Sequence, residues 1–374
     1  MTKPEVSVVV VSQGRPDDLA LCLTALHQQQ AAPAFEIIIV GDAQAQSAVA
    51  RHVLADCVTV IRDDTPNISL LRNLGIAQAS APIVAFIDDD AIALPYWLSR
   101  LTTGFADPRV QATGGYVRKP DGVSYQWTQR VIRTDGRCVA PAASDAHRPI
   151  KLEGTNMAVR RSWFVTNGGF DQAFAFYLDE TDLCLRLVQS NAAVILCDDA
   201  DVIHGFSASP RRRGDRVPHS LHDLGTSLAV FLQKWHPQPD HAAVFARFRA
   251  DQRKRLLRWM VAGLLEPRDV SVLLRSLQAG WQNGQTRPSD VAVIGSGSAA
   301  QGPICPPRYM DAVPHQFSGH IFRRSRLMRR AATKVQTQPI GVQLSAIFLK
   351  RSWLRLTESG VWVSLNSEKT PPSR

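Results

Sequence analysis

Short apolar segments alternate with helical patterns over the first ninety residues, and this alternation constrains the fold more than any other feature. Four segments have the length and apolar character of buried strands: residues 6–11, 35–40, 58–61 and 83–87. Helical spacing of apolar residues follows the first segment over 19–26, and 69–79 also reads as a helix. Strands that alternate with helices predict an α/β fold with a mostly parallel sheet and a ligand site at the carboxyl ends of its strands.

Three consecutive carboxylates, Asp88, Asp89 and Asp90, follow the fourth predicted strand directly. Adjacent acids repel one another, so such a run is tolerated where a cation or solvent screens it. An extended backbone would place Asp88 and Asp90 on one side and Asp89 on the other, so that different acids can serve a metal and a ribose without competing. Carboxylate oxygens suit Mg²⁺ or Mn²⁺. A solvated acidic turn is the alternative.

A second acidic cluster, Asp179-Glu180-Thr181-Asp182, opens a predicted helix whose Leu183 and Leu187 face inward. Acids are favourable near a helix N-terminus, and Asp182 forms an i, i+4 pair with Arg186, which would explain the cluster without any chemistry. The functional interpretation is that one of these acids removes a proton from an incoming hydroxyl group.

Basic and imidazole side chains complete the candidate site. Arg72 is able to grip a phosphate with a planar fork of donors, although an arginine on a helix is more often a surface residue. His204 would complete a metal site begun by the aspartates, with a structural histidine as the alternative. The run 211–213, with Arg211 and Arg213 at its ends, is bracketed by proline and glycine, which suits either a solvated cluster or a lid over a diphosphate.

Charge is unevenly distributed along the 374 residues. Residues 207–374 hold 26 Lys+Arg against 10 Asp+Glu, whereas residues 1–206 are acidic. The basic part favours a polyanionic or membrane-surface partner, or a solubilising face. A nucleic-acid-binding function is disfavoured because no recognised reading module accompanies the charge.

Cysteine usage and hydropathy predict a cytoplasmic protein, with a peripheral contact at the inner face of the plasma membrane as an alternative. The six cysteines show no paired spacing, which suits a reducing compartment. No apolar run approaches the roughly 20 residues that span a bilayer, and the N-terminus has no secretory apolar region.

Composition shifts predict three parts of the chain. Residues 1–236 form the α/β domain, 237–284 a basic helical extension, and 285–374 an appended C-terminal subdomain or a partly ordered tail.

Several motifs in sequence order, across roughly residues 5–236, resemble the family 2 glycosyltransferases, which have the GT-A fold. Each motif is weak alone, but their order is specific. They are residues 6–15, 35–42, 71–76, 87–90, 154–161, 168–171 and 177–186.

The resemblance implies roles for residues of this chain that match the family pattern. Ser12, Gly14, Arg15 and Asp42 would form the nucleotide loop and base contacts, and Arg72 and Asn156 would also contact the donor. Asp89 would contact the ribose or sugar, and Asp90 would bind the metal with His204 and Asp88, which is also a donor contact. Glu180 aligns with the family's catalytic base, with Asp179 as a close rival. Position 41 is a glycine where an acid is usual, so the nucleobase is less certain.

The implied function is an inverting transferase that takes a sugar from a nucleotide-diphosphate donor with Mn²⁺ or Mg²⁺. Its acceptor would be a hydroxyl group of a bacterial cell-surface polysaccharide or a lipid-linked glycan of the cell envelope. The basic segments 241–280 and 320–335 would contact anionic lipid at a membrane surface. The alternative is a sugar-nucleotide-binding protein whose transferase site has decayed.

Overall fold

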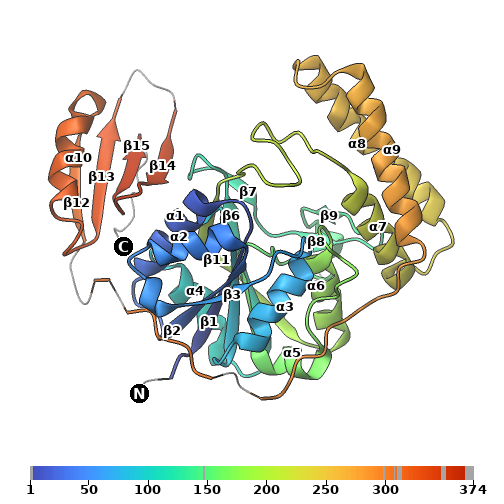
Figure 1. Cartoon of the computed structure of the whole chain (residues 1–374), viewed down its shortest axis with the longest axis horizontal. Helices are drawn as coiled ribbons and strands as arrows, with labels where there is room; N and C mark the ends of the chain where they lie inside the picture. Colours follow the sequence, from blue (N-terminus) through green and yellow to red (C-terminus); the bar gives the residue numbers. More distant parts are fainter. Residues whose placement is uncertain are drawn as a thin grey trace.

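The computed structural model describes residues 3–145, 148–297, 300–306, 308–309, 314–346 and 351–366, and Figure 1 shows its three parts. A central sheet with helices on both faces occupies the N-terminal half. A group of helices and a small separate sheet lie on opposite sides of its upper end.

The central sheet has nine strands in the order β3-β2-β1-β4-β10-β6-β11-β5, with β7 paired to β6. β1 pairs in parallel with β2 and β4, whereas β10 runs antiparallel to its neighbours β4 and β6. The predicted fold class, a mixed and mostly parallel sheet flanked by helices, is therefore confirmed. The strands are β1 (Val6–Ser12), β2 (Phe35–Gly41), β3 (Val58–Arg62), β4 (Ile83–Asp88), β5 (Ala91–Ala93), β6 (Val110–Arg118), β7 (Tyr125–Trp127), β10 (Met157–Arg160) and β11 (Ala193–His204).

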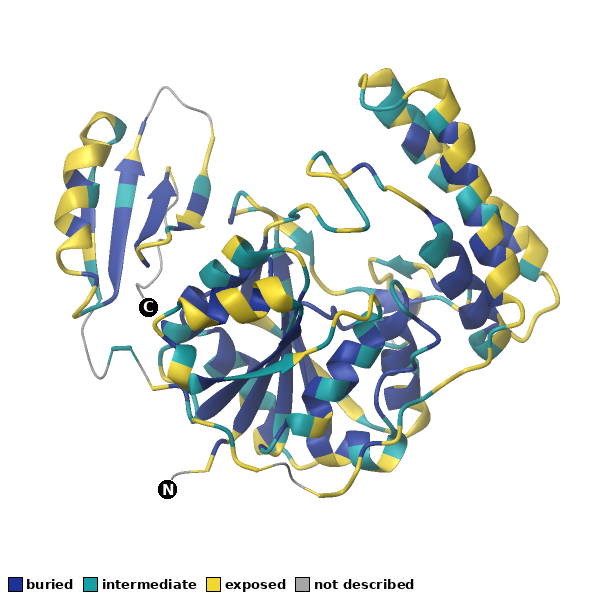
Figure 2. Ribbon diagram, in the orientation of Figure 1, coloured by how far each residue is buried: buried dark blue, intermediate teal, exposed yellow. Residues whose placement is uncertain are grey.

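Alternate residues of the buried strands supply two hydrophobic layers, and the strands form the buried centre in Figure 2. Val8 and Val10 of β1 pack in the layer beneath α1, α2 and α4, while Val9 packs in the layer beneath α3, α5 and α6. The six helices of this domain are α1 (Pro16–His27), α2 (Ala43–Ala50), α3 (Ile68–Gln78), α4 (Trp97–Thr103), α5 (Arg161–Asn167) and α6 (Asp179–Gln189).

Strand β11 differs from its prediction. The sequence predicts a strand that ends at residue 196 and a turn over 197–203, but the strand continues to His204. An irregularity between Cys197 and Val202 places Asp198 and Asp199 in solvent, after which pairing with β6 resumes and β5 is added. Asp198 and Asp199 interrupt the pairing register of β11 but do not end the strand. The strand therefore continues to His204, which lies at its carboxyl end.

The basic helical part is an antiparallel hairpin, α8 (His241–Val261) and α9 (Pro267–Gly284), packed against α7 (His222–Trp235). The helical character predicted for the extension over 237–284 agrees with two helices. A turn at 262–266 separates them, and Glu266 and Asp269 form a capping box that starts α9. The predicted boundary at 236/237 falls between α7 and α8.

The C-terminal part contains a four-stranded sheet in the order β12-β13-β15-β14, covered on one face by α10 (Arg324–Ala332). Its strands are β12 (His315–His320), β13 (Ile340–Ser345), β14 (Trp353–Leu356) and β15 (Trp362–Leu365). Leu354 and Trp362 join the hydrophobic layer beneath α1. The sequence predicts either a subdomain or a partly ordered tail over 285–374. Part of this range lies outside the described residues.

Two further observations bear on the sequence predictions. All six cysteines are free thiols. Among the helices in the described ranges, none combines the length and apolar composition needed to cross a bilayer.

Candidate active site

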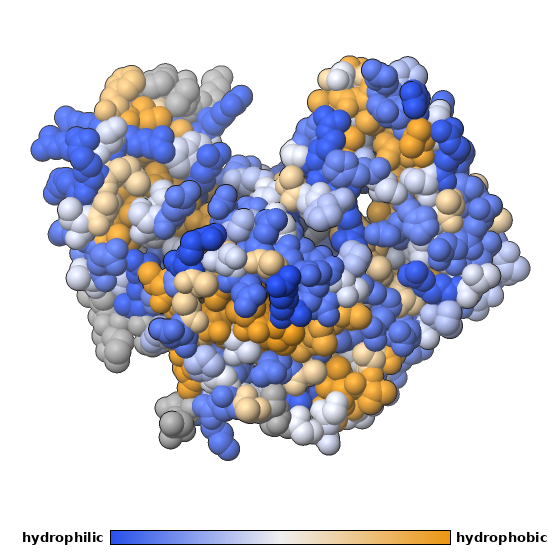
Figure 3. Space-filling model, viewed as in Figure 1, coloured by the Kyte–Doolittle hydropathy of each residue, from blue (hydrophilic) through white to orange (hydrophobic). Residues whose placement is uncertain are grey.

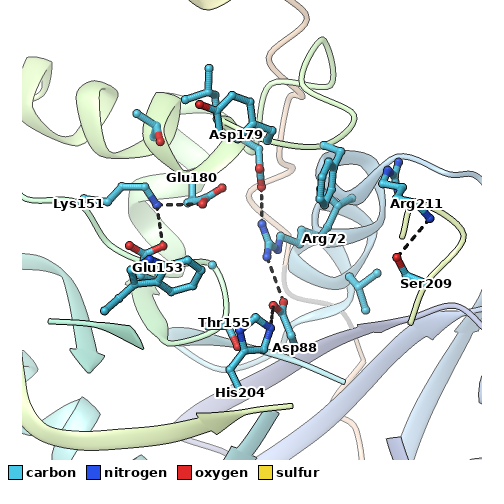
Figure 4. A pocket seen from close by; sticks show the side chains of 18 of the residues that line it. Arg72, Asp88, Lys151, Glu153, Thr155, Asp179, Glu180, His204, Ser209 and Arg211 are labelled. Atoms are coloured by element: carbon cyan, nitrogen blue, oxygen red, sulfur yellow. Dashed lines mark hydrogen bonds and ion pairs between the residues drawn. The ribbon is translucent and has the colours of Figure 1, made fainter. Parts of the chain in front are cut away.

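A cavity of about 580 Å³ opens at the carboxyl ends of β1 and β4, as the parallel topology predicts. Its walls include the β1–α1 loop, α3, the end of β4, residues 151–155, the start of α6 and the segment after β11. A two-stranded ribbon, β8 (Val131–Ile132) with β9 (Cys138–Val139), adds a further wall. Figure 4 shows the charged side chains that converge there.

Asp88, Asp90 and His204 meet at the floor of the cavity. Nε2 of His204 lies 3.4 Å from Asp90 Oδ1 and 4.0 Å from Asp88 Oδ2, and one ligand atom from each residue falls within 4.8 Å of the others. The three residues predicted as metal ligands are thus brought together from β4, the turn after it and the end of β11.

The atoms of this cluster fit a divalent cation. His204 Nδ1 lies 3.2 Å from Gln126 Oε1. With Nδ1 as the donor, Nε2 directs a lone pair at the carboxylates. Asp90 Oδ1 is buried without a hydrogen-bond partner. Two carboxylates and an imidazole form a donor set that suits Mn²⁺ or Mg²⁺.

Basic groups hold the other oxygen of Asp90. Oδ2 accepts a hydrogen bond from Ser207 N at 3.0 Å and lies 2.9 Å from Arg15 Nη1 and 3.4 Å from Arg212 Nη2. Burial alone would raise the pKa of Asp90, but with His204 protonated and donating from Nε2, this hydrogen bond and the charges of His204, Arg15 and Arg212 lower it below its usual value. Asp90 is therefore ionised over the physiological range.

Asp89 does not follow the alternation expected of an extended backbone, because residues 89 and 90 form a turn and the guanidinium of Arg15 contacts both carboxylates. The carboxylate of Asp89 is fully buried, lies 2.5 Å from Arg15 Nη2 and is absent from the cavity wall. Burial raises its pKa well above the ordinary value despite Arg15. Its predicted donor contact stays a prediction, since Arg15 stands between it and the cavity.

Arg72 links the two acidic clusters. Its guanidinium pairs with Asp179 at the start of α6 and lies 3.4 Å from Asp88 Oδ1 at the end of β4. It also lies 5.3 Å above the ring of Phe170, and its side chain is only 5% exposed. Arg72 is thus a buried residue of the site and not a surface arginine.

Glu180 has a different partner, Lys151, which the sequence reasoning missed. The buried Nζ of Lys151 lies 2.9 Å from Glu180 Oε1 and 3.2 Å from Glu153 Oε2, and it donates to Leu152 O (Figure 4). Burial would raise the pKa of Glu180, but the charge of Lys151 lowers it. Burial and the neighbouring Glu180 raise the pKa of Asp179. No local pattern marks Lys151 as a partner of Glu180, because the two residues are 29 positions apart in sequence.

Of the residues predicted at the nucleotide end, Arg15 lines the cavity, together with Val11 and Gln13, whereas Ser12, Gly14 and Asp42 lie beside it. Asp42 accepts a hydrogen bond from Gly14 N at 2.7 Å, and its other oxygen caps α2. Ser12 is buried with its hydroxyl unpaired. These contacts fix the loop in which the nucleotide base was predicted to bind.

The remaining predicted donor contacts have separate positions. Asn156 is fully buried and cross-links Trp97 Nε1 to the carbonyls of Tyr116 and Ala200, so it supports the sheet behind the site. Arg211 lines the cavity and pairs with Asp223. Arg213 is exposed, pairs with Asp215 and is not part of the wall.

Comparison with protein families gives a match of residues 7–177 to the family described as Glycosyl transferase family 2. The matched range contains Arg72 and Asp88–Asp90 but stops before Asp179, Glu180 and His204.

Two curated relatives illustrate the similarity. O-antigen biosynthesis protein RfbC of Myxococcus xanthus is 27% identical over 256 residues, which cover 63% of this chain and 20% of that protein. N-acetylglucosaminyl-diphospho-decaprenol L-rhamnosyltransferase of Mycobacterium tuberculosis (strain ATCC 25618 / H37Rv) is 26% identical over 191 residues, covering 46% of this chain and 57% of that protein. The chain therefore spans one fifth and just over half of these relatives.

A solved structure, that of GalNAc-T7 with UDP, GalNAc and Mn²⁺, superposes with a TM-score of 0.50 at 13% identity. It covers 63% of this chain and 49% of that one. A likeness at this identity shows a shared fold.

Proposed function

Because residues 7–177 of this chain match the family described as Glycosyl transferase family 2, we propose that the protein transfers a sugar from a nucleoside-diphosphate sugar to a hydroxyl group of a glycan, with inversion. One observation carries the proposal. Asp88, Asp90 and His204, whose ligand atoms lie close enough together to hold a cation, share one cavity with Glu180, the proposed base. The fold is of the GT-A type that the sequence implied.

The donor would lie over β1 and β4. Asp88, Asp90 and His204 would hold Mn²⁺ or Mg²⁺, which when bound stabilises the negative charge that develops on a departing nucleoside diphosphate. Arg211 and Arg212, from the segment after β11, line the same cavity and would contact the diphosphate. The nucleobase of the donor would bind near Asp42.

The acceptor hydroxyl would lose its proton to Glu180. Its oxygen forms a bond to the anomeric carbon as the bond from that carbon to the diphosphate oxygen breaks. The nucleoside diphosphate leaves with the electron pair, and attack from the opposite face inverts the configuration. Glu180 suits the role better than Asp179, because its side chain is 21% exposed against 4%.

The acceptor class is proposed from the relatives, whose names include O-antigen biosynthesis and a diphospho-decaprenol substrate. A cell-envelope polysaccharide or a lipid-linked glycan would agree with both. Exposed arginines on α8 and α10 support the proposal that the protein acts beside an anionic membrane surface.

The test compares Glu180→Gln with Asp179→Asn in transfer assays over a panel of nucleotide sugars and glycan acceptors. We expect Glu180→Gln to lose transfer by about 10²–10⁴-fold, the usual contribution of a positioned base, with nucleotide binding intact. If Asp179→Asn alone loses transfer with binding retained, Asp179 is the base. If the wild-type chain binds nucleotide sugars but transfers nothing, the transferase proposal is wrong and the chain is a binding protein.

A further inference from the structure

Three arginines outside the cavity wall have no acidic partner among the residues that the structure describes. Arg216 lies in the segment after β11, and Arg255 and Arg258 lie on α8. In the described part of the chain, none of these three forms an ion pair with a carboxylate, whereas Arg211 and Arg213 in the same segment each do.

Aromatic rings hold two of these guanidinium groups in place. Cζ of Arg216 lies 3.9 Å from the ring centroid of Phe206, and Cζ of Arg255 lies 4.6 Å from that of Trp259. Rings fix a cation without neutralising it, so the groups keep their full charge for another ligand. Both Phe206 and Arg216 also have a positive φ, at 61° and 70°, a conformation that costs free energy in residues other than glycine.

Burial and neighbouring guanidinium groups lower the pKa of two arginines in this cluster. Burial lowers the pKa of Arg255, and the charges of Arg216, Arg258 and Arg212 lower it further. Burial and Arg212 do the same to the pKa of Arg216. Positive groups gathered in this way repel one another, and a bound anion would remove that repulsion.

The cluster adjoins the cavity but lies outside the part that would hold the donor. Tyr177 lines the cavity and stacks on Phe248 of α8, with ring centroids 6.1 Å apart. Arg213 Nη1 approaches Leu264 O of the hairpin turn at 3.4 Å. Arg212 is directed to Asp90, on the donor side, whereas Arg255 and Arg258 belong to a helix beyond the family match at 7–177.

Apolar side chains extend from the cluster to the end of the hairpin. Val261 is 85% exposed, and Trp259, Met260, Leu264 and Leu265 are partly exposed. Figure 3 shows hydrophobic surface over the α8–α9 hairpin, which projects from the molecule. Cations beside an exposed apolar tip suit a ligand that has both a phosphate and a hydrocarbon chain.

We propose that Arg216, Arg255 and Arg258 bind the phosphate of a lipid-linked acceptor, whose hydrocarbon chain lies along the tip of the hairpin. The role of this lipid as the acceptor rests on the proposed function, whereas the binding of its phosphate does not. The geometry would place a sugar attached to that phosphate next to Tyr177, toward Glu180.

The experiment measures binding of farnesyl diphosphate to the full chain by titration calorimetry, with farnesol and inorganic pyrophosphate as partial probes. We expect the wild-type chain to prefer farnesyl diphosphate to both. The double variant Arg216→Gln/Arg255→Gln should bind it at least about tenfold more weakly, since each charge-assisted hydrogen bond is worth about one order of magnitude in affinity. Arg253→Gln is the matched control, because Arg253 is exposed on the same helix two residues away, which is a rotation of about 200°.

Nucleoside diphosphates with Mn²⁺, titrated into the same variants, distinguish the two sources of phosphate. Unchanged affinity in the double variant supports an acceptor site and shows that the variant is folded. A parallel loss of nucleotide affinity would assign the arginines to the donor and overturn the proposal, as would equal binding of farnesyl diphosphate by variant and wild type. Absence of sugar transfer would count against the proposed function alone, because these titrations do not require turnover.

Discussion

Asp179 and Glu180 are adjacent in sequence, yet each has its own cation. Arg72 pairs with Asp179 and Lys151 with Glu180, and both cations are nearly buried. Two neighbouring carboxylates would otherwise repel each other at low dielectric. The residue-scale consequence is a division of work in which Asp179 orients Arg72 and Glu180 stays ionised at the cavity.

Replacing Lys151 by methionine tests this division. Without the cation, burial dominates and the pKa of Glu180 rises. The acid limb of the pH profile of kcat/KM should therefore move upward by about one to three pH units, the usual effect of an opposite charge in contact. The measurement is transfer activity from pH 5 to 9.

Glu153→Gln is the matched control, because it removes the other carboxylate on Lys151 and leaves the cation on Glu180. Its acid limb should stay in place or move to lower pH. An unchanged profile in Lys151→Met would exclude Glu180 as the group that titrates.

At the scale of elements, hydrophobic periodicity predicts the regular strands and helices but not the irregularities within them. The strands β1, β2 and β4 lie within one residue of their predicted bounds, because continuous apolar runs leave few alternatives. The extension of β11 to His204 was missed because Asp198 and Asp199 suggest a turn, while the pairing that carries the strand past them is with distant residues. The carboxylates and His204 were identifiable from sequence. Lys151 and the unpaired arginines were not, because only the tertiary structure defines their neighbours.

At the scale of the whole molecule, the C-terminal sheet is fastened to the α/β domain through Trp362 and Gln28. Trp362 is 1% exposed, its Nε1 donates to Gln28 Oε1 at 3.1 Å, and Gln28 Nε2 donates to Gly360 O at 2.7 Å. Gln28 is the C-cap residue of α1, and Arg15 is the N-cap residue of the same helix. The appended part therefore supports a helix at the proposed donor site.

Trp362→Ala should lower the free energy of unfolding by about 3–5 kcal/mol, as for other large buried side chains replaced by alanine. Chemical denaturation followed by circular dichroism measures the change. Val293→Ala, at a side chain 95% exposed, should leave the free energy unchanged within about 0.5 kcal/mol. A loss confined to a separate early transition, with the main transition intact, would mean that the C-terminal sheet does not support the α/β domain.

The central claim is that Asp88, Asp90 and His204 bind a divalent cation together with a nucleoside diphosphate. Thermal unfolding of the wild-type chain, Asp90→Asn and the exposed control Asp251→Asn, over a panel of nucleoside diphosphates with and without Mn²⁺, tests it most directly. For wild type and control, we predict stabilisation of about 2.7 kcal/mol at one hundred times the dissociation constant when Mn²⁺ and one nucleotide are both present. Asp90→Asn should lose this synergy, and equal metal-dependent stabilisation of Asp90→Asn would contradict the account.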